Sequence, residues 1–434
     1  MALLQPPIPE SDFFLTFLNE YGGVLLAWGW IITLFFVLTI AWEVYKLLKQ
    51  IDYFSAIQWT FLQITVPEEN AQTPKAMESF FDVIAGIHKN PDITERFFEG
   101  YTEAWFSCEI HCEANRVRYI MVIPTNHRKF FEGVIYGQYP LAEIREVEDY
   151  TQAFPIDKIE KDFDLYGTEI ITVADEFYPI RTYHEYEDSL AEDDKYIDPH
   201  QALVEAYTNI REGEQFWVQI LVRPKDAKVI QKWTAAGEEA IAKIAGTAKE
   251  KEKGMIIEFF HFLRNLPFAV IDALLNGPPE AEKKKDKQLR PVFTPLDQAR
   301  MEGITRKVSR NGFKTKIRVV HISPPGKLVK QSAATAMGAF KQFNTFHMNS
   351  FKPDPATKTN GPNYLLKQTR RSFRKRRILL LFQIRDMWGD DSGVMMNPEE
   401  LATLYHFPIK YVKAPLVQRA TSGLGSAPPD IPYI

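Results

Sequence analysis

An uncharged apolar run near the N-terminus constrains this chain more than any other feature. Residues 24–42 read VLLAWGWIITLFFVLTIAW and contain no Asp, Glu, Lys or Arg. A helix rises 1.5 Å per residue, so these residues just cross a hydrocarbon core of about 30 Å. Trp28, Trp30 and Trp42 would lie at the interfaces of the bilayer. The run predicts a single transmembrane helix over residues 24–45.

The charges on either side of this run predict its orientation. Three acidic and no basic residues precede it, whereas Lys46 and Lys49 follow it directly. Basic residues mark the cytoplasmic side, so residues 1–23 are predicted to lie outside a plasma (inner) membrane and the bulk of the chain inside the cell. A cleaved signal peptide fits poorly, because no basic residue precedes the run and no small-residue cleavage site follows it. A buried helix of a soluble protein is the alternative.

The two cysteines agree with a cytoplasmic location. Cys108 and Cys112 are the only ones in 434 residues, which excludes a disulfide framework and fits a reducing compartment. Together with His111 they resemble a cluster of metal ligands. On a strand, however, both thiols share one face with Ile110, while Glu109 and His111 lie on the other. A pair of core cysteines is therefore predicted, since a zinc site would need distant partners.

Residues 54–150 predict one compact α+β unit. Alternating apolar positions indicate strands, and apolar steps of three and four residues indicate helices that begin near Thr73 and Asn126. The predicted strands cover residues 57–66, 105–112, 117–123 and 141–147. The order β-α-β-β-α-β is that of a ferredoxin-like unit.

A second, looser copy is predicted from residues 151–224 and 311–350. Its strands fall on residues 177–183, 216–222 and 313–322, and its helices on residues 199–210 and 330–346. The two copies share almost no identity, so the duplication rests on pattern alone. The predicted fold class is α+β, with one transmembrane helix followed by two ferredoxin-like (βαββαβ) units.

A helical insertion is predicted over residues 225–310, and a basic segment, a C-terminal helix and a tail over residues 351–434. Within the insertion, residues 229–245 form an amphipathic pattern. Residues 255–275 are apolar, but Glu258, Arg264, Pro267 and Asp272 interrupt them too often for a membrane span. This segment either lies in the membrane interface or packs on the domain.

The net charge of −4 conceals a strong asymmetry. Residues 283–377 hold 24 Lys and Arg against 4 Asp and Glu. The density is greatest in a basic segment of seven residues: Lys367, Arg370, Arg371, Arg374, Lys375, Arg376 and Arg377. On a helix, the first four of them would form one ridge. Such a segment could bind nucleic acid, bind anionic lipid or a partner protein, or be a solvated face neutralised by the acidic half of the chain.

No catalytic signature stands out in the sequence. Gly326-Lys327 is followed by Leu328 and lacks the earlier glycine of a nucleotide-binding loop. The acidic run over residues 185–198 holds seven acids and one lysine, which is typical of a solvated loop rather than of a carboxylate pair with separated pKa values. We therefore predict no enzymatic activity, no cofactor and no metal.

Several stretches resemble an uncharacterised bacterial family of membrane-anchored domains. They are residues 65–88, 104–150, 214–224, 337–353 and 397–408, and the likeness extends over most of residues 54–429. Members of that family occur ahead of or beside HerA/FtsK-like ATPases similar to those of conjugation and type IV secretion. In fused members, a segment like residues 400–408 followed by Lys413-Ala414-Pro415 leads into the ATPase. The ATPase part is absent here.

The resemblance implies a non-enzymatic accessory subunit of a DNA- or protein-translocation machine. It would dock a separately encoded ATPase, and the expected docking residues are Glu400, Leu404, Tyr405, His406, Phe407 and Pro408. The membrane is the other expected partner, with DNA and further copies of the chain as additional candidates. The alternative is a membrane-bound interaction module whose basic segment binds anionic lipid and has no role with DNA.

Overall fold

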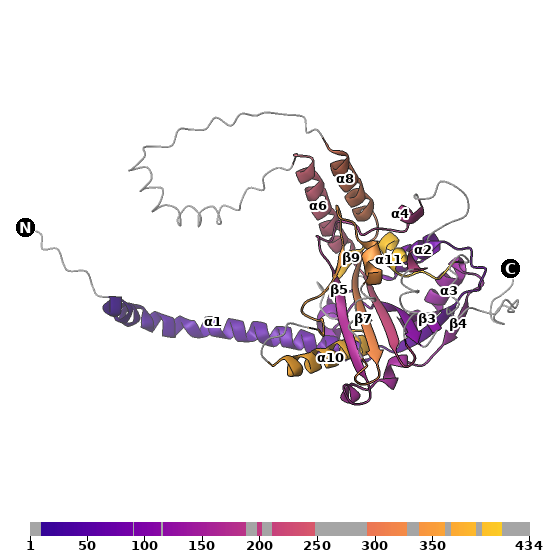
Figure 1. Cartoon of the computed structure of the whole chain (residues 1–434). Coiled ribbons are helices and arrows are strands. Elements are labelled where there is room, and N and C mark those ends of the chain that lie inside the picture. Colours follow the sequence, from indigo (N-terminus) through magenta and orange to yellow (C-terminus); the bar gives the residue numbers. More distant parts are fainter. Residues whose placement is uncertain are drawn as a thin grey trace, which may run out of the picture. The chain divides into compact units, whose positions relative to one another are not determined.

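The computed structural model describes residues 10–89, 91–113, 116–187, 198–201, 211–247, 293–327, 338–360, 366–387 and 393–409. The chain is a mixed α+β protein that divides into two compact units (Figure 1). The first unit comprises residues 1–60, 89–104 and 124–128, and the second the remainder. The two are described separately.

The first unit is dominated by helix α1, Glu10–Ser55. Its stretch Trp28–Ser55 is long and apolar enough, by length and composition, to cross a membrane. Large apolar side chains along it, such as Phe35, Leu38 and Ile40, are exposed. The structure thus contains an N-terminal apolar helix at the place where the sequence predicts an anchor.

The C-terminal turns of α1 pack against protein on one side. The ring of Trp42 lies 6.0 Å from that of Phe97, which belongs to the π-helical turn η2, Glu95–Glu99. Gly100 follows with φ +72, and a Cβ there would lie 2.3 Å from the carbonyl carbon of Lys49. Only glycine permits this approach. Other apolar side chains of these turns, such as Leu48 and Ile51, remain exposed.

A nine-stranded antiparallel sheet forms the second unit. Its strands are β1 Trp59–Thr65, β2 Phe106–Glu113, β3 Arg116–Pro124, β4 Glu143–Glu146, β5 Asp164–Thr172, β6 Gln215–Pro224, β7 Phe313–Ser323, β8 Phe351–Pro353 and β9 Val394–Met396. The order is β4-β1-β3-β2-β6-β7-β5-β8, and β9 pairs with β7. The β2–β6 pairing joins two halves of the sheet. Counted from its outer edge, the first half has the strand order β4-β1-β3-β2, and the second half has the corresponding order β8-β5-β7-β6.

The strands of the first half match the sequence prediction, whereas the second half requires a correction. Residues 177–183 form no strand: the amide of Ile180 donates to the Glu400 carboxylate and that of Tyr183 to the Thr403 hydroxyl. These amides bind side chains instead of a strand ladder. The first strand of this half is instead β5, and β8 lies beyond residue 350, where the predicted second unit ends.

Helices cover both faces of the sheet. The helices of the second unit are α2 Pro74–Ile84, α3 Arg128–Gln138, α4 His184–Glu187, α6 Ala227–Ile244, α8 Pro295–Val308, α10 Lys367–Gln383 and α11 Pro398–Leu404. Short 3₁₀ segments are η1 Ala85–Ile87, η3 Thr125–His127, η4 Tyr150–Ala153, η5 Ile156–Lys158 and η6 Lys341–Phe343. Of the predicted helices over residues 199–210 and 330–346, residues 202–210 and 330–337 lie outside the described residues.

Alternate residues of the strands place these helices on opposite faces. Val218 and Val319 belong to the main core with residues of α2, α3 and α11. Their neighbours Trp217 and Val320 belong to a second core with residues of α10. Successive side chains of a strand point to opposite faces, so α10 covers the face opposite to α2, α3 and α11.

The predicted insertion contributes a helical pair. Helices α6 and α8 pack side by side, as Figure 1 shows, and share a small core with Trp233 and Val308. A Cβ at Gly237 would lie 2.8 Å from Val308, so the glycine lets the two helices approach closely. The apolar segment predicted at residues 255–275 lies outside the described residues.

Candidate functional site

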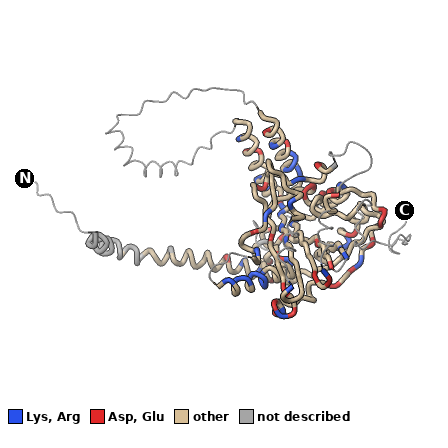
Figure 2. Tube along the Cα trace, in the orientation of Figure 1, with Lys and Arg blue, Asp and Glu red and all other residues tan. Residues whose placement is uncertain are grey.

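Helix α10 carries all seven residues of the predicted basic segment, visible as a blue stretch in Figure 2. Its sequence, KQTRRSFRKRRILLLFQ, is rich in Arg, Lys, Leu and Gln, which favour helices. Leu366 precedes the helix with φ +57. The basic segment is therefore helical, and each of its charges has a defined direction relative to the sheet.

The inner face of α10 is apolar toward its C-terminus. Ile378, Leu379 and Phe382 are buried in the second core of the sheet. Opposite Ile378 lies Gly167 of β5, where a Cβ would be only 3.0 Å from the Ile378 side chain. A glycine inside a strand often marks such a close approach. These contacts fix the helix on the sheet.

Two basic residues of α10 are used inside the domain. The Nζ of Lys375 lies 2.8 Å from Glu160 Oε1 and 2.6 Å from Asp164 Oδ1. Arg374 Nη1 donates to the carbonyl oxygen of Lys358 at 2.8 Å. Burial alone would raise the pKa of Glu160, but hydrogen bonds from Lys375 and Ser372 bring it below its ordinary value. Both residues thus hold α10 in place and are poor candidates for binding a partner.

The opposite side of α10, here called the outer face, combines charge with apolar surface. Lys367, Arg376 and Arg377 are exposed, and Arg370 and Arg371 are half-buried. Large apolar side chains between them are also exposed: Leu366 by 67%, Phe373 by 63%, Leu380 by 43% and Ile384 by 45%. Leu366, Phe373 and Leu380 are spaced by seven residues and follow one side of the helix. The outer face is therefore a basic amphipathic surface.

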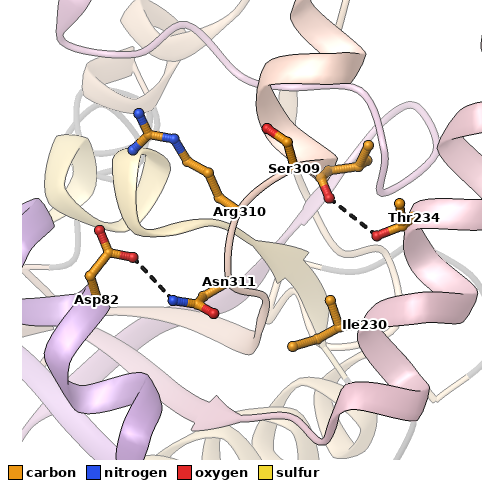
Figure 3. Close-up of a pocket in the computed structure, with 7 residues that line it drawn as sticks. Asp82, Ile230, Thr234, Ser309, Arg310 and Asn311 are labelled. Carbon is orange, nitrogen blue, oxygen red and sulfur yellow. Dashed lines mark hydrogen bonds between the residues drawn. The ribbon is translucent and has the colours of Figure 1, made fainter.

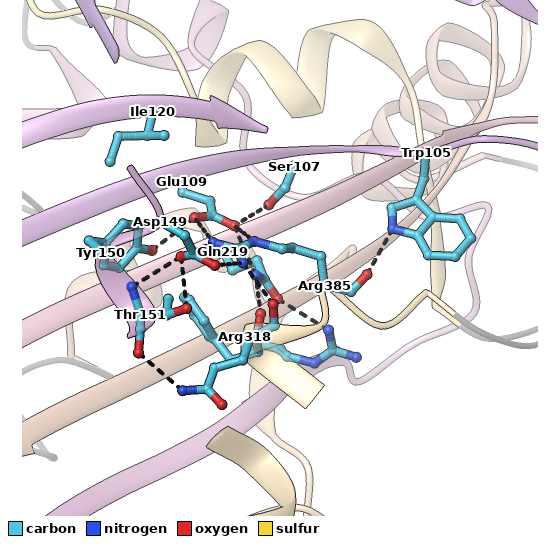
Figure 4. A network of polar contacts seen from close by, with 12 residues as sticks. Trp105, Ser107, Glu109, Ile120, Asp149, Tyr150, Thr151, Gln219, Arg318 and Arg385 are labelled. Atoms are coloured by element: carbon cyan, nitrogen blue, oxygen red, sulfur yellow. Dashed lines mark hydrogen bonds and ion pairs between the residues drawn. The ribbon is translucent and has the colours of Figure 1, made fainter. Parts of the chain in front are cut away.

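A buried charge network fixes the C-terminal end of α10 (Figure 4). Arg385, 4% exposed, directs Nε at Glu109 Oε1 at 3.1 Å. Its two terminal nitrogens reach the Asp149 carboxylate at 2.7 and 2.9 Å. Burial would raise the pKa of Asp149, but the Arg385 guanidinium lowers it below its usual range. The indole of Trp105 donates to the Arg385 carbonyl oxygen at 2.7 Å.

A second arginine extends this network across the sheet. Arg318 of β7 is fully buried, and its Nε lies 2.8 Å from Glu169 Oε1. Its other nitrogens donate to Gln219 Oε1 at 3.1 Å and to the Asp386 carbonyl oxygen at 2.6 Å. Gln219 in turn donates to Glu109 at 2.9 Å. Each carboxylate is held by a cation or an amide, so this arrangement supports structure rather than acid–base chemistry.

The cysteines lie where the strand pattern predicts. Cys108 and Cys112 are free, buried and part of the main core, whereas His111 contacts Gln215 and Tyr150 on the other face. Burial raises the pKa of Cys108 well above its ordinary value. These thiols are therefore unreactive core residues.

The predicted docking segment is not a surface. Glu400, Leu404, Tyr405, His406, Phe407 and Pro408 are all buried. Lys307 lies 3.0 Å from Glu400 Oε2, and His406 Nε2 lies 2.8 Å from Asp198 Oδ1. The Pro408 carbonyl oxygen accepts from Asn70 at 3.1 Å. Docking through these side chains would require the segment to leave the core, and their docking role stays a prediction. Lys413-Ala414-Pro415 lies outside the described residues.

Two buried histidines make stability depend on pH. Burial lowers the pKa of His111 to about 3, aided by Arg118, and lowers that of His200 to about 3, aided by His406. Both pKa values lie below the unfolded value of about 6.5. Each histidine therefore contributes its full stabilisation above about pH 6.5. As the pH drops from there toward 3, the free energy of unfolding falls by about 1.4 kcal/mol per pH unit for each histidine.

Chemical unfolding of the detergent-solubilised protein measures this effect. We expect the free energy of unfolding to fall by about 2 kcal/mol per histidine between about pH 6.5 and pH 5. His111→Gln removes one titrating group and should reduce the slope by about 1.4 kcal/mol per pH unit, whatever its effect at neutral pH. A free energy that stays constant over this range would contradict the assignment.

One cluster of possible metal ligands could not be predicted from the sequence. Ligand atoms of Glu78, His184 and Glu399 come within 4.8 Å of one another. They belong to α2, α4 and α11, which the chain separates by more than a hundred residues in each case. No local spacing signals this cluster, because only the fold brings its members together.

Comparison with known sequences supplies a family but no activity. The profile of the family described as "Domain of unknown function (DUF8128)" matches residues 54–420. No curated protein matches the chain.

Proposed function

Because this chain belongs to the DUF8128 family, whose function is not known, we propose a role from its own surface. It is a membrane-anchored, non-enzymatic interaction module whose outer face of α10 lies on the anionic headgroups of the membrane that α1 spans. The bulk of the chain is cytoplasmic and residues 1–23 lie outside. The inner leaflet of the plasma membrane supplies the negative charge.

The observation that carries this proposal is the exposed apolar row between the basic residues. A helix that only contacts phosphates gains nothing from exposing Leu380 and Ile384, whereas a helix in the membrane interface buries them among headgroups and acyl chains. Juxtamembrane Lys and Arg add about 1 kcal/mol each near an anionic leaflet. The two contributions belong to the same side of one helix, which favours lipid over DNA.

The family resemblance supports a broader role. We propose that the protein is an accessory subunit of a DNA- or protein-translocation machine that contacts a separately encoded HerA/FtsK-like ATPase. Contact would use surfaces other than the buried residues 400–408. Crosslinking in native membranes followed by purification tests this role, and repeated failure to recover such an ATPase would contradict it without affecting the lipid proposal.

We also propose that each half of the sheet is a ferredoxin-like unit. When the strands are numbered within their own half, each half has the strand order 4-1-3-2. The pairs β1–β4, β2–β3, β5–β7 and β5–β8 are antiparallel. Both observations support the proposal. An experimental structure that lacks a helical crossover between β5 and β6 or between β7 and β8 would contradict it.

A fluorescent probe on α10 tests the lipid contact in the intact protein. Leu380→Cys places a reactive thiol on the outer face, while Cys108 and Cys112 are buried. In nanodiscs with about 30% anionic lipid, an environment-sensitive dye at this position should shift to the blue relative to nanodiscs of neutral lipid. The shift arises because headgroups and acyl chains replace water around the dye.

The matched control is Leu141→Cys, at a position that is 73% exposed and remote in sequence from α10. Its dye should give the same spectrum in both lipid mixtures. Equal spectra for the α10 probe in neutral and anionic nanodiscs would refute the proposal.

A further inference from the structure

Three side chains from separate elements form a compact set of metal-ligating groups. Glu78 of α2 and Glu399 of α11 are buried, and His184 of α4 is half-buried. One ligand atom from each lies within 4.8 Å of the other two. Ligands of tetrahedral zinc, about 2.0–2.1 Å from the ion, lie about 3.4 Å apart. Small side-chain movements would therefore bring these atoms onto one ion.

Neighbouring hydroxyl groups orient both carboxylates. Tyr183 donates to Glu78 Oε2 at 2.6 Å, and Thr182 donates to Glu399 Oε1 at 2.6 Å. Ligating carboxylates are commonly held in this way by groups outside the coordination sphere. Each of these hydrogen bonds uses one oxygen of its carboxylate, so the second oxygen of Glu78 and of Glu399 is left for another partner.

The remaining oxygen of Glu399 is an independent sign of a missing ligand. Glu399 is 1% exposed, and its Oε2 is buried without a hydrogen-bond partner. Two arginines lie at the limit of an ion pair with this carboxylate: Arg310 is 3.9 Å from Oε2 and Arg306 is 3.9 Å from Oε1. Buried polar atoms are nearly always satisfied, so an exception calls for an explanation such as an absent ion.

Arg310 neutralises this cluster when no ion is bound. Its guanidinium pairs with Glu78 Oε1 while remaining one-third exposed. The same side chain lines a cavity of about 530 Å³, with Asp82 and Asn311 beside it and Ile230 and Thr234 of α6 across from it (Figure 3). Arg310 therefore has space into which it can move away from Glu78.

A second cavity offers access to Glu399. It has a volume of about 240 Å³, and its lining includes Thr182, Arg306 and Glu399. The Glu399 carboxylate, whose Oε2 lacks a hydrogen-bond partner, thus borders a space through which a hydrated ion can approach.

We propose that Glu78, His184 and Glu399 bind a first-row divalent cation such as Zn²⁺, which displaces Arg310 toward the neighbouring cavity. Two carboxylates balance the charge of the divalent ion, so the Arg310 guanidinium is no longer needed to neutralise them. Imidazole among carboxylates favours zinc and its neighbours over Mg²⁺ and Ca²⁺, which prefer oxygen ligands throughout. This inference is independent of the lipid contact at α10.

Calorimetric titration of Zn²⁺ into the full-length protein in detergent, purified through a tag without histidine, tests the proposal. We expect one ion per chain and much weaker binding of Mg²⁺. Glu78→Gln, His184→Ala and Glu399→Gln should each weaken Zn²⁺ binding by at least about tenfold, and Thr182→Val by about tenfold through the lost orientation of Glu399. Arg310→Met should bind Zn²⁺ more tightly, because it removes the competing cation.

The matched control is Glu214→Gln, which changes another buried carboxylate, paired with His321 outside the cluster. It should leave Zn²⁺ affinity unchanged, and circular dichroism should show every variant folded. Absence of stoichiometric binding by the wild-type protein would overturn the proposal. So would equal losses in Glu214→Gln and Glu399→Gln, or weaker binding by a folded Arg310→Met.

Discussion

Arg385→Met is expected to lower the free energy of unfolding by about 3–5 kcal/mol. The arginine is buried between the Glu109 and Asp149 carboxylates, and its guanidinium also lies 4.6 Å from the centre of the Phe61 ring. Methionine fills a similar volume but leaves two buried carboxylates without their cation. The desolvation of these charges, rather than the loss of attraction alone, produces the large effect. Chemical unfolding monitored by circular dichroism measures it.

An exposed ion pair provides the comparison. Arg145 donates to Glu143 at 2.7 Å, but both side chains are largely in solvent. Arg145→Met should cost less than about 1 kcal/mol. Adding Glu109→Gln and Asp149→Asn to Arg385→Met should restore part of the lost stability, since no buried charge then lacks a partner. Equal effects of Arg385→Met and Arg145→Met would show that the network does not fix α10.

The strands of the first half could be predicted because their signals are local. In β2 and β3, alternate residues face the main core, so the period-two pattern of apolar residues is visible in the sequence. The pairing of β2 with β6 could not be predicted. The two strands are separated by about a hundred residues, and no local pattern specifies which strand edges meet.

In the second half of the sheet, one residue pattern that is typical of a strand does not form one, because its backbone amides bind side chains. Residues 177–183 are rich in aromatic and β-branched residues, yet their amides bind Glu400 and Thr403. Strand β5 contains Gly167 and Glu169, which weaken its strand signal. Both residues are explained by tertiary contacts, the glycine by α10 and the glutamate by Arg318.

The basic segment was evident from the sequence, but the direction of each charge was not. Lys375 and Arg376 are adjacent, yet the first forms ion pairs within the domain and the second is exposed. The burial of the predicted docking residues could not be predicted for a related reason. Asn397 and Glu400 form a capping box at the start of α11, and the apolar residues after them are core rather than surface.

The second large effect concerns the affinity of α10 for lipid. Replacing Lys367, Arg376 and Arg377 together with Gln should weaken binding to anionic vesicles by about 3 kcal/mol, or about 150-fold. Phe373→Ser combined with Leu380→Ser removes apolar surface at unchanged charge and should weaken binding by about 2 kcal/mol or more. Soluble fragments that begin at Asp52 allow the affinity to be measured without the anchor, with circular dichroism confirming that each fragment is folded.

Parallel titration of these three fragments with anionic vesicles and with duplex DNA, at about 50 and 150 mM salt, distinguishes a lipid-binding α10 from a DNA-binding one. We expect the wild-type fragment to prefer vesicles and both variants to lose vesicle affinity. Phosphate contacts depend on charge alone, so any residual DNA binding should fall in the charge variant and stay unchanged in the apolar variant. Tight DNA binding by the wild-type fragment, with vesicle affinity unaffected by the loss of Phe373 and Leu380, would contradict the account and assign α10 to nucleic acid.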